Sequence, residues 1–243
     1  MDTTELQQLD RRIYERFVKA FATYNLLADD DRILVGLSGG KDSLCLLEML
    51  ARRSRIQHPR FTVEAVHVRM ENIAYASSTD YLEQFCEECG VRLHLVTTSF
   101  DPSTDTRKHP CFLCSWNRRK QLFNLAQQLG FNKIALGHHM DDILHTALMN
   151  QLYQGRFDTM PARLTLRKMP ITIIRPLCMV AEQDILRYAA LRGYRKQEKR
   201  CPYECDTHRE DIKMLFENIE RMNPEARFSL WNALNRENKL IQE

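Results

Sequence analysis

The sequence has no long apolar run. Among its 243 residues no stretch approaches the ~20 apolar residues that a membrane-spanning helix needs, so we expect no membrane partner. The first residues, MDTTELQQLDRR, contain no apolar segment typical of a secretory signal. These two absences lead us to expect a cytoplasmic protein.

The sequence also has no internal repeat and no low-complexity segment. Apolar residues make up 44% and charged residues 28% of the chain, and the net charge is only +3. Such a mixture is typical of an ordinary globular protein and does not by itself indicate a partner. The length suits one large domain, or one domain with a small appendage.

The eight cysteines come without a secretory signal. In a reducing compartment, cysteines are seldom arranged as a disulfide framework. Metal ligands, catalytic thiols and small core residues are the alternatives that remain.

Apolar patterning predicts strands that alternate with helices. Strands are expected at 33–37, 61–68, 91–96 and 133–136, and helices at 3–27, around 44–50, and at 80–89, 115–129 and 141–153. This alternation is typical of a parallel sheet with crossover helices, that is, an α/β fold. Residues 162–177 resemble two short strands around a turn, and helices are expected at 182–191, 208–222 and 224–238.

The stretch GLSGGKDS joins the first predicted strand to a helix, at the sheet edge where α/β folds bind ligands. Gly39 and Gly40 allow successive backbone N–H groups to converge on an anion, and Lys41 adds a full positive charge. Asp42 would repel a phosphate unless it holds Mg²⁺ or polarises the reacting group. The spacing is neither that of a Walker A loop nor GxGxxG. The simpler alternative is a Gly-Gly turn with an exposed lysine and a capping serine.

The motif SGGKDS, Ser38 to Ser43, resembles the signature of the PP-loop ATP pyrophosphatases, which are N-type adenylating enzymes. This resemblance implies a Rossmann-like fold and a bound ATP that is cleaved between its α- and β-phosphates. The substrate is adenylated at an oxygen, and a nucleophile then displaces AMP. Members include tRNA sulfurtransferases, tRNA lysidine synthetase and amidotransferases, and the motif alone does not choose among them.

Four cysteines form two close pairs, Cys111 with Cys114 and Cys201 with Cys205. Thiolates at such spacings can share one metal centre, either a closed zinc site with four ligands or an iron–sulfur cluster with three. A third pair, Cys86 and Cys89, lies within a predicted helix and is interpreted as core or incidental.

Longer segments around these cysteines resemble the tRNA 2-thiocytidine synthetase branch of the PP-loop family. The segments are CFLCSWNRRK, KIALGHHMDD, IIRPL and CPY. The resemblance covers about residues 30–205. It implies a [4Fe–4S] cluster on Cys111, Cys114 and a third ligand, which matches Cys201 by the following Pro-Tyr. Because the spacing here is C-x3-C where relatives have C-x2-C or a single cysteine, Cys205 remains an alternative.

The segment GHHMDD follows the fourth predicted strand, so Gly137, Asp141 and Asp142 are expected at the same sheet edge as SGGKDS. Paired carboxylates near a triphosphate are typical Mg²⁺ ligands, and helix capping is the alternative role. The resemblance places the aspartate pair in the ATP site, with Asp142 predicted to be the closer. Arg118 matches a basic residue of the relatives and could stabilise charge at the α-phosphate. His67 ends the second strand, where such folds contact adenine or ribose.

Together these features predict an ATP-dependent tRNA sulfurtransferase that replaces the C2 oxygen of a base, cytidine in the anticodon loop, by sulfur. Asp42, Asp142 and Arg118 are the predicted catalytic residues. The predicted partners are tRNA, a sulfur donor such as a cysteine desulfurase or sulfide, and a second copy in a homodimer. Basic residues suited to RNA phosphates occur in three groups (52–55, 163–168 and 187–200). Alternatives are thiouridine or lysidine synthesis, amide formation, or an RNA-associated nucleotide-binding module with a structural zinc.

The predicted organisation has three parts. Residues 1–30 form an N-terminal helix, and 31–178 form the PP-loop ATP-binding domain. Residues 179–243 form a mostly helical extension that carries the last cluster cysteine.

Overall fold

The computed structural model describes residues 3–71, 73–75, 77–101, 110–197, 199–200 and 208–243. Its helices are α1 (Thr3–Tyr24), α2 (Lys41–Ser54), α3 (Asp80–Cys89), α4 (Pro110–Gln128), α5 (Met140–Gln154), α6 (Glu182–Arg192), α7 (His208–Met222) and α8 (Ala226–Arg236). Its strands are β1 (Asp31–Gly36), β2 (Phe61–Met70), β3 (Ala74–Tyr75), β4 (Arg92–Thr98), β5 (Lys133–Ala135), β6 (Arg163–Thr165), β7 (Thr172–Ile174), β8 (Lys199–Arg200) and β9 (Ile241–Gln242). None of the described helices is both long and apolar enough to span a bilayer.

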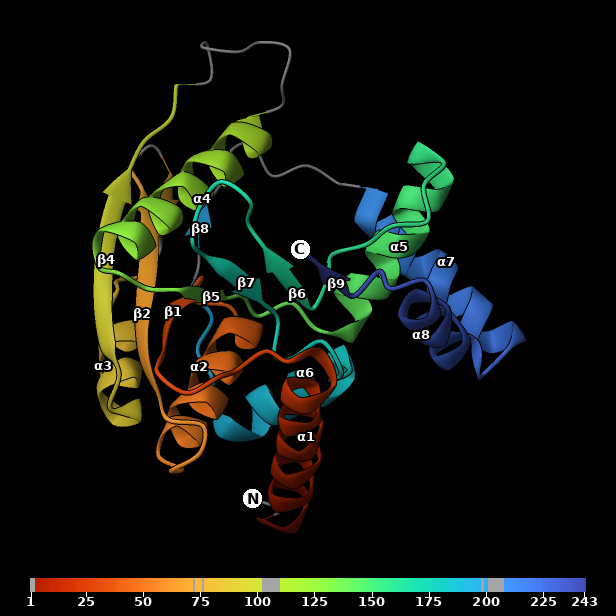
Figure 1. Cartoon of the computed structure of the whole chain (residues 1–243), viewed down its shortest axis with the longest axis horizontal. Coiled ribbons are helices and arrows are strands. Elements are labelled where there is room, and N and C mark those ends of the chain that lie inside the picture. Colours follow the sequence, from red (N-terminus) through yellow and green to blue (C-terminus); the bar gives the residue numbers. More distant parts are fainter. Residues whose placement is uncertain (1–2, 72, 76, 102–109, 198, 201–207) are drawn as a thin grey trace.

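Seven strands form the main sheet, in the order β4-β2-β1-β5-β7-β6-β9 (Figure 1). The pairs β4–β2, β2–β1, β1–β5 and β5–β7 are parallel, whereas β6 runs antiparallel to β7. The prediction of an α/β fold with a mostly parallel sheet is therefore confirmed.

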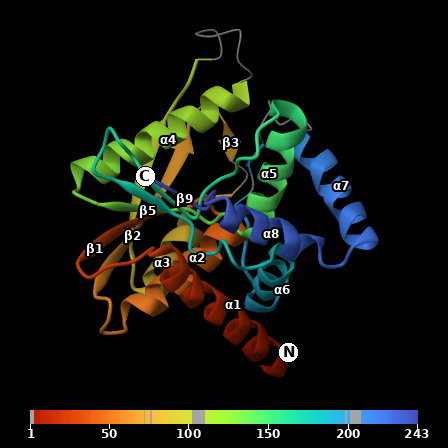
Figure 2. The same ribbon diagram turned by 45° about the vertical axis from the view of Figure 1, so that its right-hand side comes forward.

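Strand β1 lies in the middle of the sheet and is buried on both faces. Ile33 and Val35 belong to the core cluster that includes residues of α1, α2, α3, α5 and α6, whereas Leu34 packs with Leu122 and Ala126 of α4 on the other face. Alternate side chains of a strand point to opposite faces, so a strand covered on both sides needs a continuous apolar run. The view in Figure 2 shows α4 on one side of the sheet and α1, α2 and α3 on the other.

The late part of the chain is joined to the rest of the fold. Strand β9 pairs with β6, and β8 pairs with β3 in a separate two-stranded sheet. Helix α6 packs against α1 and α2. The division at residues 30 and 178 remains a prediction.

Helix α4 begins at Pro110, five residues before the start that the sequence predicts. Proline is tolerated in the first helical turn because the N–H that it lacks has no partner there. Cys111 and Cys114 therefore lie on a helix, one turn apart, instead of in a preceding loop.

Candidate active site

The turn Ser38–Ser43 connects β1 to α2 and has the expected shape of an anion-binding loop. Gly39 has φ +81°, which favours glycine, and the hydroxyls of Ser38 and Ser43 lie 3.1 Å apart. The Ser43 hydroxyl donates to the Gly40 carbonyl at 2.9 Å. Gly40 is the N-cap of α2, so the unpaired N–H groups of the helix begin beside this loop.

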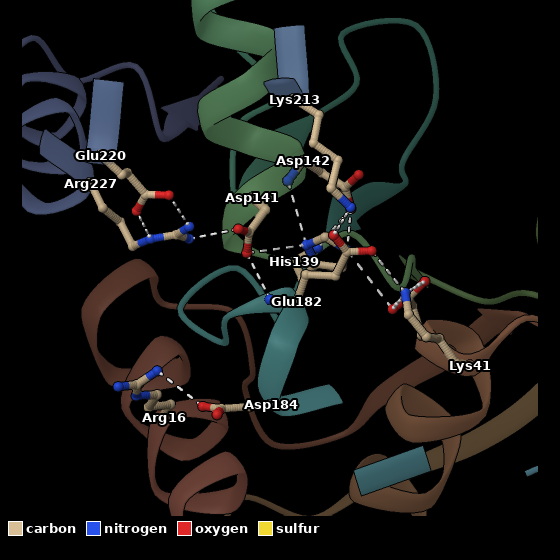
Figure 3. Close-up of polar contacts among 11 residues, drawn as sticks. Arg16, Lys41, His139, Asp141, Asp142, Glu182, Asp184, Lys213, Glu220 and Arg227 are labelled. Atoms are coloured by element: carbon tan, nitrogen blue, oxygen red, sulfur yellow. Dashed lines mark hydrogen bonds and ion pairs between the residues drawn. The ribbon is translucent and has the colours of Figure 1, made fainter. Parts of the chain in front are cut away.

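Lys41 is held by two carboxylates. Its Nζ lies 2.8 Å from Asp42 Oδ1 and 3.2 Å from Glu182 Oε1, and Lys213 binds the other oxygen of Glu182 at 3.1 Å (Figure 3). Burial would lower the pKa of Lys41, but Asp42 and Glu182 outweigh it and raise that pKa. Burial likewise opposes ionisation of Glu182, yet Lys213 and Lys41 hold its pKa at about 2. Two ammonium groups therefore converge beside the phosphate loop on a carboxylate that α6 supplies.

Gly137, which follows β5, packs closely against the loop. A Cβ added at this position would lie 3.0 Å from the Asp42 carbonyl and from the Ser43 nitrogen. Such a distance is too short unless the loop moves. The proximity of GHHMDD to SGGKDS, expected from sheet topology, is thus present as direct backbone contact.

The two carboxylates of the Asp141–Asp142 pair have different surroundings. Asp141 is buried: Oδ1 lies 2.7 Å from an Arg227 nitrogen, and Oδ2 accepts from the Glu182 N–H at 2.7 Å (Figure 3). Asp142 caps α5 by accepting from the His139 N–H at 3.0 Å, and its side chain remains 34% exposed. Asp141 thus ties α5 to α6 and α8, whereas Asp142 stays accessible.

The His139 imidazole lies between the two accessible carboxylates. Its Nε2 is 3.8 Å from Asp42 Oδ1 and 3.4 Å from Asp142 Oδ2. The described residues contain no group of three or more His, Cys, Asp or Glu side chains arranged to hold a metal ion. Since Mg²⁺ commonly takes one or two carboxylates and completes its shell with phosphate and water, Asp42 and Asp142 fit that ion beside a triphosphate.

A cavity of about 600 Å³ opens at the carboxyl ends of β1, β2 and β5. His67 and Arg118 line it, as do Ser38 and Gly40 of the loop. Five cations and no carboxylate occur among the described residues of its wall, and the cations are Arg118, Arg119, Arg175, Lys196 and Arg209. A wall of this composition favours a polyanionic ligand.

Three buried polar atoms of the cavity wall have no hydrogen-bond partner among the described residues. They are His67 Nε2, Arg118 Nε and Gln197 Nε2. Buried polar atoms are normally paired, so a group of unpaired ones in one cavity indicates a polar ligand. Arg118 is otherwise held by the Tyr75 hydroxyl, which lies 3.0 Å from one of its terminal nitrogens.

His138 and Arg175 form a neutral–cationic contact in the wall of the cavity. Arg175 is buried, and its Nε donates to His138 Nδ1 at 3.2 Å. Burial first, and the charge of Arg175 second, lower the pKa of His138 to about 3. Its imidazole is therefore neutral near pH 7.

The two predicted cluster pairs differ in how far the structure describes them. Cys111 and Cys114 are partly buried at the start of α4, and Cys114 packs beside Met70, Ile73 and Phe100. Arg118, one turn further along the same helix, lines the cavity. Cys201 and Cys205 lie outside the described residues. The described part of the predicted cluster site is thus a pair of thiols one helical turn from the cavity wall.

The other cysteines have packing roles. Cys45, Cys86 and Cys178 are buried in the main core, and burial raises the pKa of each thiol. For Cys86 this agrees with its interpretation as a core residue of the third pair.

Several residues of the site were not found from the sequence. Glu182 of α6 contacts Lys41 of the loop, Lys213 of α7 contacts Glu182, and Gln197 donates its N–H to the Gly39 carbonyl at 3.0 Å. Arg175 had a signal, because it is a charged residue inside the apolar run IIRPL. The others had none that sequence reasoning could use.

The predicted basic surface is partly engaged within the protein. Ion pairs hold four of its arginines: Arg52 with Asp10, Arg163 with Glu243, Arg187 with Glu5, and Arg192 with Glu48. Tyr194, within the last of these basic groups, packs edge-on against Phe85 and Tyr188 and donates to Glu48. Of the predicted basic residues, Lys196 lines the cavity.

Comparisons with known proteins identify the family of the chain. The PP-loop domain family matches residues 7–212. The tRNA-cytidine(32) 2-sulfurtransferase of Citrifermentans bemidjiense is 34% identical over 92% of this chain and 89% of its own. The protein of that name (with the suffix 1) from Francisella tularensis subsp. novicida is 32% identical over 96% of this chain and 88% of its own.

Among solved structures, the U34-tRNA thiolase NcsA from Methanococcus maripaludis, with its [4Fe–4S] cluster, is similar in fold. Its TM-score is 0.77 at 24% identity, over 95% of this chain and 79% of that one. The chain belongs to the PP-loop family, in the branch whose curated members are named tRNA-cytidine(32) 2-sulfurtransferases.

Proposed function

We propose that this chain is an ATP-dependent tRNA sulfurtransferase that adenylates the C2 oxygen of a tRNA cytidine and replaces it by sulfur. The observation that carries the proposal is the continuity of the cavity wall. One cavity is bounded by the PP-loop on one side and, on the other, by the helix that carries Cys111 and Cys114. The relatives of the chain point to the same reaction.

ATP binding is assigned to the loop Ser38–Ser43. The triphosphate would replace Asp42 and Glu182 as the partner of Lys41, while the N–H groups at the start of α2 and the Lys41 charge hold the phosphates. Lys213 supplies a second ammonium group from α7. Gly137 serves this site by allowing β5 to approach the loop. Asp42 and Asp142 are assigned to Mg²⁺, and Asp141 is assigned to positioning α6 and α8.

The first chemical step needs the α-phosphate and the C2 oxygen of the base in one cavity. Attack of that oxygen forms the O–P bond and releases pyrophosphate, whose charge Lys41 neutralises. Arg118 lines the cavity between the thiol pair and the loop, where its guanidinium can stabilise charge on the α-phosphate. A sulfide-level nucleophile then forms the C2–S bond as AMP leaves with the former C2 oxygen.

The cluster is assigned to Cys111, Cys114 and either Cys201 or Cys205. The two described thiols fit this role because they lie one turn apart and partly accessible on α4. When bound, a cluster with three protein ligands supplies an iron on which a sulfide-level sulfur can bind. A sulfur donor such as a cysteine desulfurase or sulfide, a homodimer and a cytoplasmic location remain predictions.

The decisive experiment is nucleoside analysis of tRNA from a strain that lacks this gene. Loss of 2-thiocytidine supports the proposal, loss of a thiouridine moves the substrate to another base, and an unchanged profile contradicts it. Complementation separates the site residues: Lys41→Ala and Cys111→Ala should fail to restore the nucleoside. Cys89→Ala is the matched control because Cys89 is a partly buried thiol of a CxxC pair on α3. Full activity of Cys111→Ala would instead favour a PP-loop reaction that needs no cluster.

A further inference from the structure

One side of α4 carries exposed aromatic side chains next to the cysteine pair. Phe112 and Trp116 are each 50% exposed, and Lys120, four residues further on, is also exposed. Residues four apart share a side of a helix and rise by about 6 Å. The same helix turns Leu122 and Ala126 into the core. Half of each ring therefore stays accessible on the outer side of the helix.

Lys120 stabilises this surface without covering it. Its Nζ lies 5.2 Å from the centroid of the Trp116 ring, within the range of a cation–π contact, while half of Trp116 remains accessible. Two aromatic rings and an ammonium group thus follow one another along about two helical turns.

The surroundings of this face are cationic. Arg118 and Arg119 lie on the same helix and line the cavity whose described wall contains five cations and no carboxylate. Exposed aromatic rings beside basic side chains are the usual composition of surfaces that bind unpaired nucleotides, since bases stack on the rings and cations contact phosphates. Protein–protein interfaces are depleted in lysine, so this composition favours a nucleic acid over a second protein.

We propose that Phe112, Trp116 and Lys120 form a docking surface for unpaired nucleotides of the RNA substrate, next to the nucleotide that enters the cavity. The inference rests on the proposed function, because it assumes that the substrate is RNA. It extends that function by assigning the neighbouring bases to the two rings and a phosphate to Lys120. Because the surface lies at the end of α4 that carries Cys111 and Cys114, it would hold the RNA loop close to the two thiols.

The test measures binding of a fluorescently labelled anticodon stem-loop RNA by anisotropy at several salt concentrations. Trp116→Ala and Phe112→Ala should each weaken binding about 5- to 150-fold, the range for loss of one stacked base. Trp116→Phe should restore most of the affinity. Phe228→Ala, which removes a 52% exposed ring from α8, is the matched control and should bind like the wild type.

The salt dependence separates the two kinds of contact. Lys120→Ala should reduce the slope of log affinity against log salt by about 0.7, the value for one phosphate contact on a single strand. Trp116→Ala should weaken binding at every salt concentration and leave the slope unchanged. RNA should also quench the fluorescence of Trp116, because the other tryptophan, Trp231, is buried. This quenching should disappear in Trp116→Phe.

The outcomes distinguish this inference from the proposed function. Wild-type protein that binds no RNA contradicts both. Wild-type protein that thiolates tRNA, together with alanine variants of normal affinity, overturns the docking surface alone. If Trp116→Ala instead converts a dimer to a monomer in sedimentation experiments, with RNA affinity intact, the face is a contact between two copies and the inference is wrong.

Discussion

The imidazole of His67 gives the sharpest test of how the cavity selects its nucleotide. Its Nδ1 lies 2.7 Å from the Leu37 carbonyl oxygen, and a carbonyl can only accept, so Nδ1 carries a proton. Burial lowers the pKa of His67, which favours the neutral ring. The remaining nitrogen, Nε2, is then an acceptor, and it is buried without a described partner. A bound ligand with a hydrogen-bond donor at this position would therefore supply the partner that Nε2 lacks.

The exocyclic amino group of adenine is such a donor. Because Nε2 is already out of water in the free protein, pairing it recovers the cost of an unsatisfied buried group, about 1–3 kcal/mol. We expect purine riboside triphosphate, which lacks the amino group, to bind about 5- to 150-fold more weakly than ATP. GTP, which has a carbonyl there, should bind more weakly still.

Calorimetric titration of ATP and of purine riboside triphosphate into wild-type and His67→Leu protein measures the difference in affinity between the two nucleotides. The variant should bind the two equally, because it has no acceptor, whereas His67→Gln should keep part of the preference. An unchanged preference in His67→Leu would refute the assignment of Nε2 to the amino group. Failure of the wild type to bind ATP at all would contradict the proposed function instead.

Three further predictions concern stability and the phosphate loop. Asp141→Asn should lower the free energy of unfolding, measured in urea, by about 1.5–3 kcal/mol and leave the affinity for ATP unchanged. Asp142→Asn should weaken ATP binding and leave the free energy of unfolding unchanged. Equal effects of the two variants would contradict the separate roles. The free energy of unfolding should fall as the pH drops from ~6.5, the usual pKa of histidine, toward about 3, the pKa of His138, because in this range only the unfolded chain protonates this imidazole. His138→Gln should flatten this part of the plot of urea-derived free energy against pH. An unchanged slope would refute the lowered pKa of His138. Gly137→Ala should weaken ATP binding in the same titration and cost about 1–3 kcal/mol of stability, because its Cβ meets the loop backbone; normal values for both would show that the loop can shift.

The parts of the fold that sequence patterns predicted well are those decided by local interactions. Helix α3 begins and ends at the predicted residues, because Gly90 adopts the left-handed conformation that ends a helix. The connection from β1 through SGGKDS to α2 also follows from adjacent residues. The start of α4 was predicted too late, because the polar residues before Pro110 obscured the helical turn that holds Cys111.

Contacts between distant segments could not be read from local patterns. Lys41 meets Glu182 across 141 residues, and Gln197 lies over Gly39, where an added Cβ would be 2.7 Å from that of Gln197. Glu182 looked like an ordinary acidic residue in the first turn of a helix, where it complements the helix dipole. Only the packing of α6 beside the phosphate loop gives it a second role.

The Asp141–Asp142 pair shows why a motif can locate a site and still leave its chemistry undecided. Neighbouring residues on a helix point about 100° apart, so two adjacent carboxylates at the start of α5 cannot both face one ligand. The carboxylate of Asp141 is taken by Arg227 and by the start of α6, whereas that of Asp142 stays accessible. Mg²⁺ beside a triphosphate needs only one or two protein carboxylates, so in the proposed site the second would come from Asp42 in the loop. The site is thus formed between the two motifs, and the neighbouring aspartate holds the helices that keep them together.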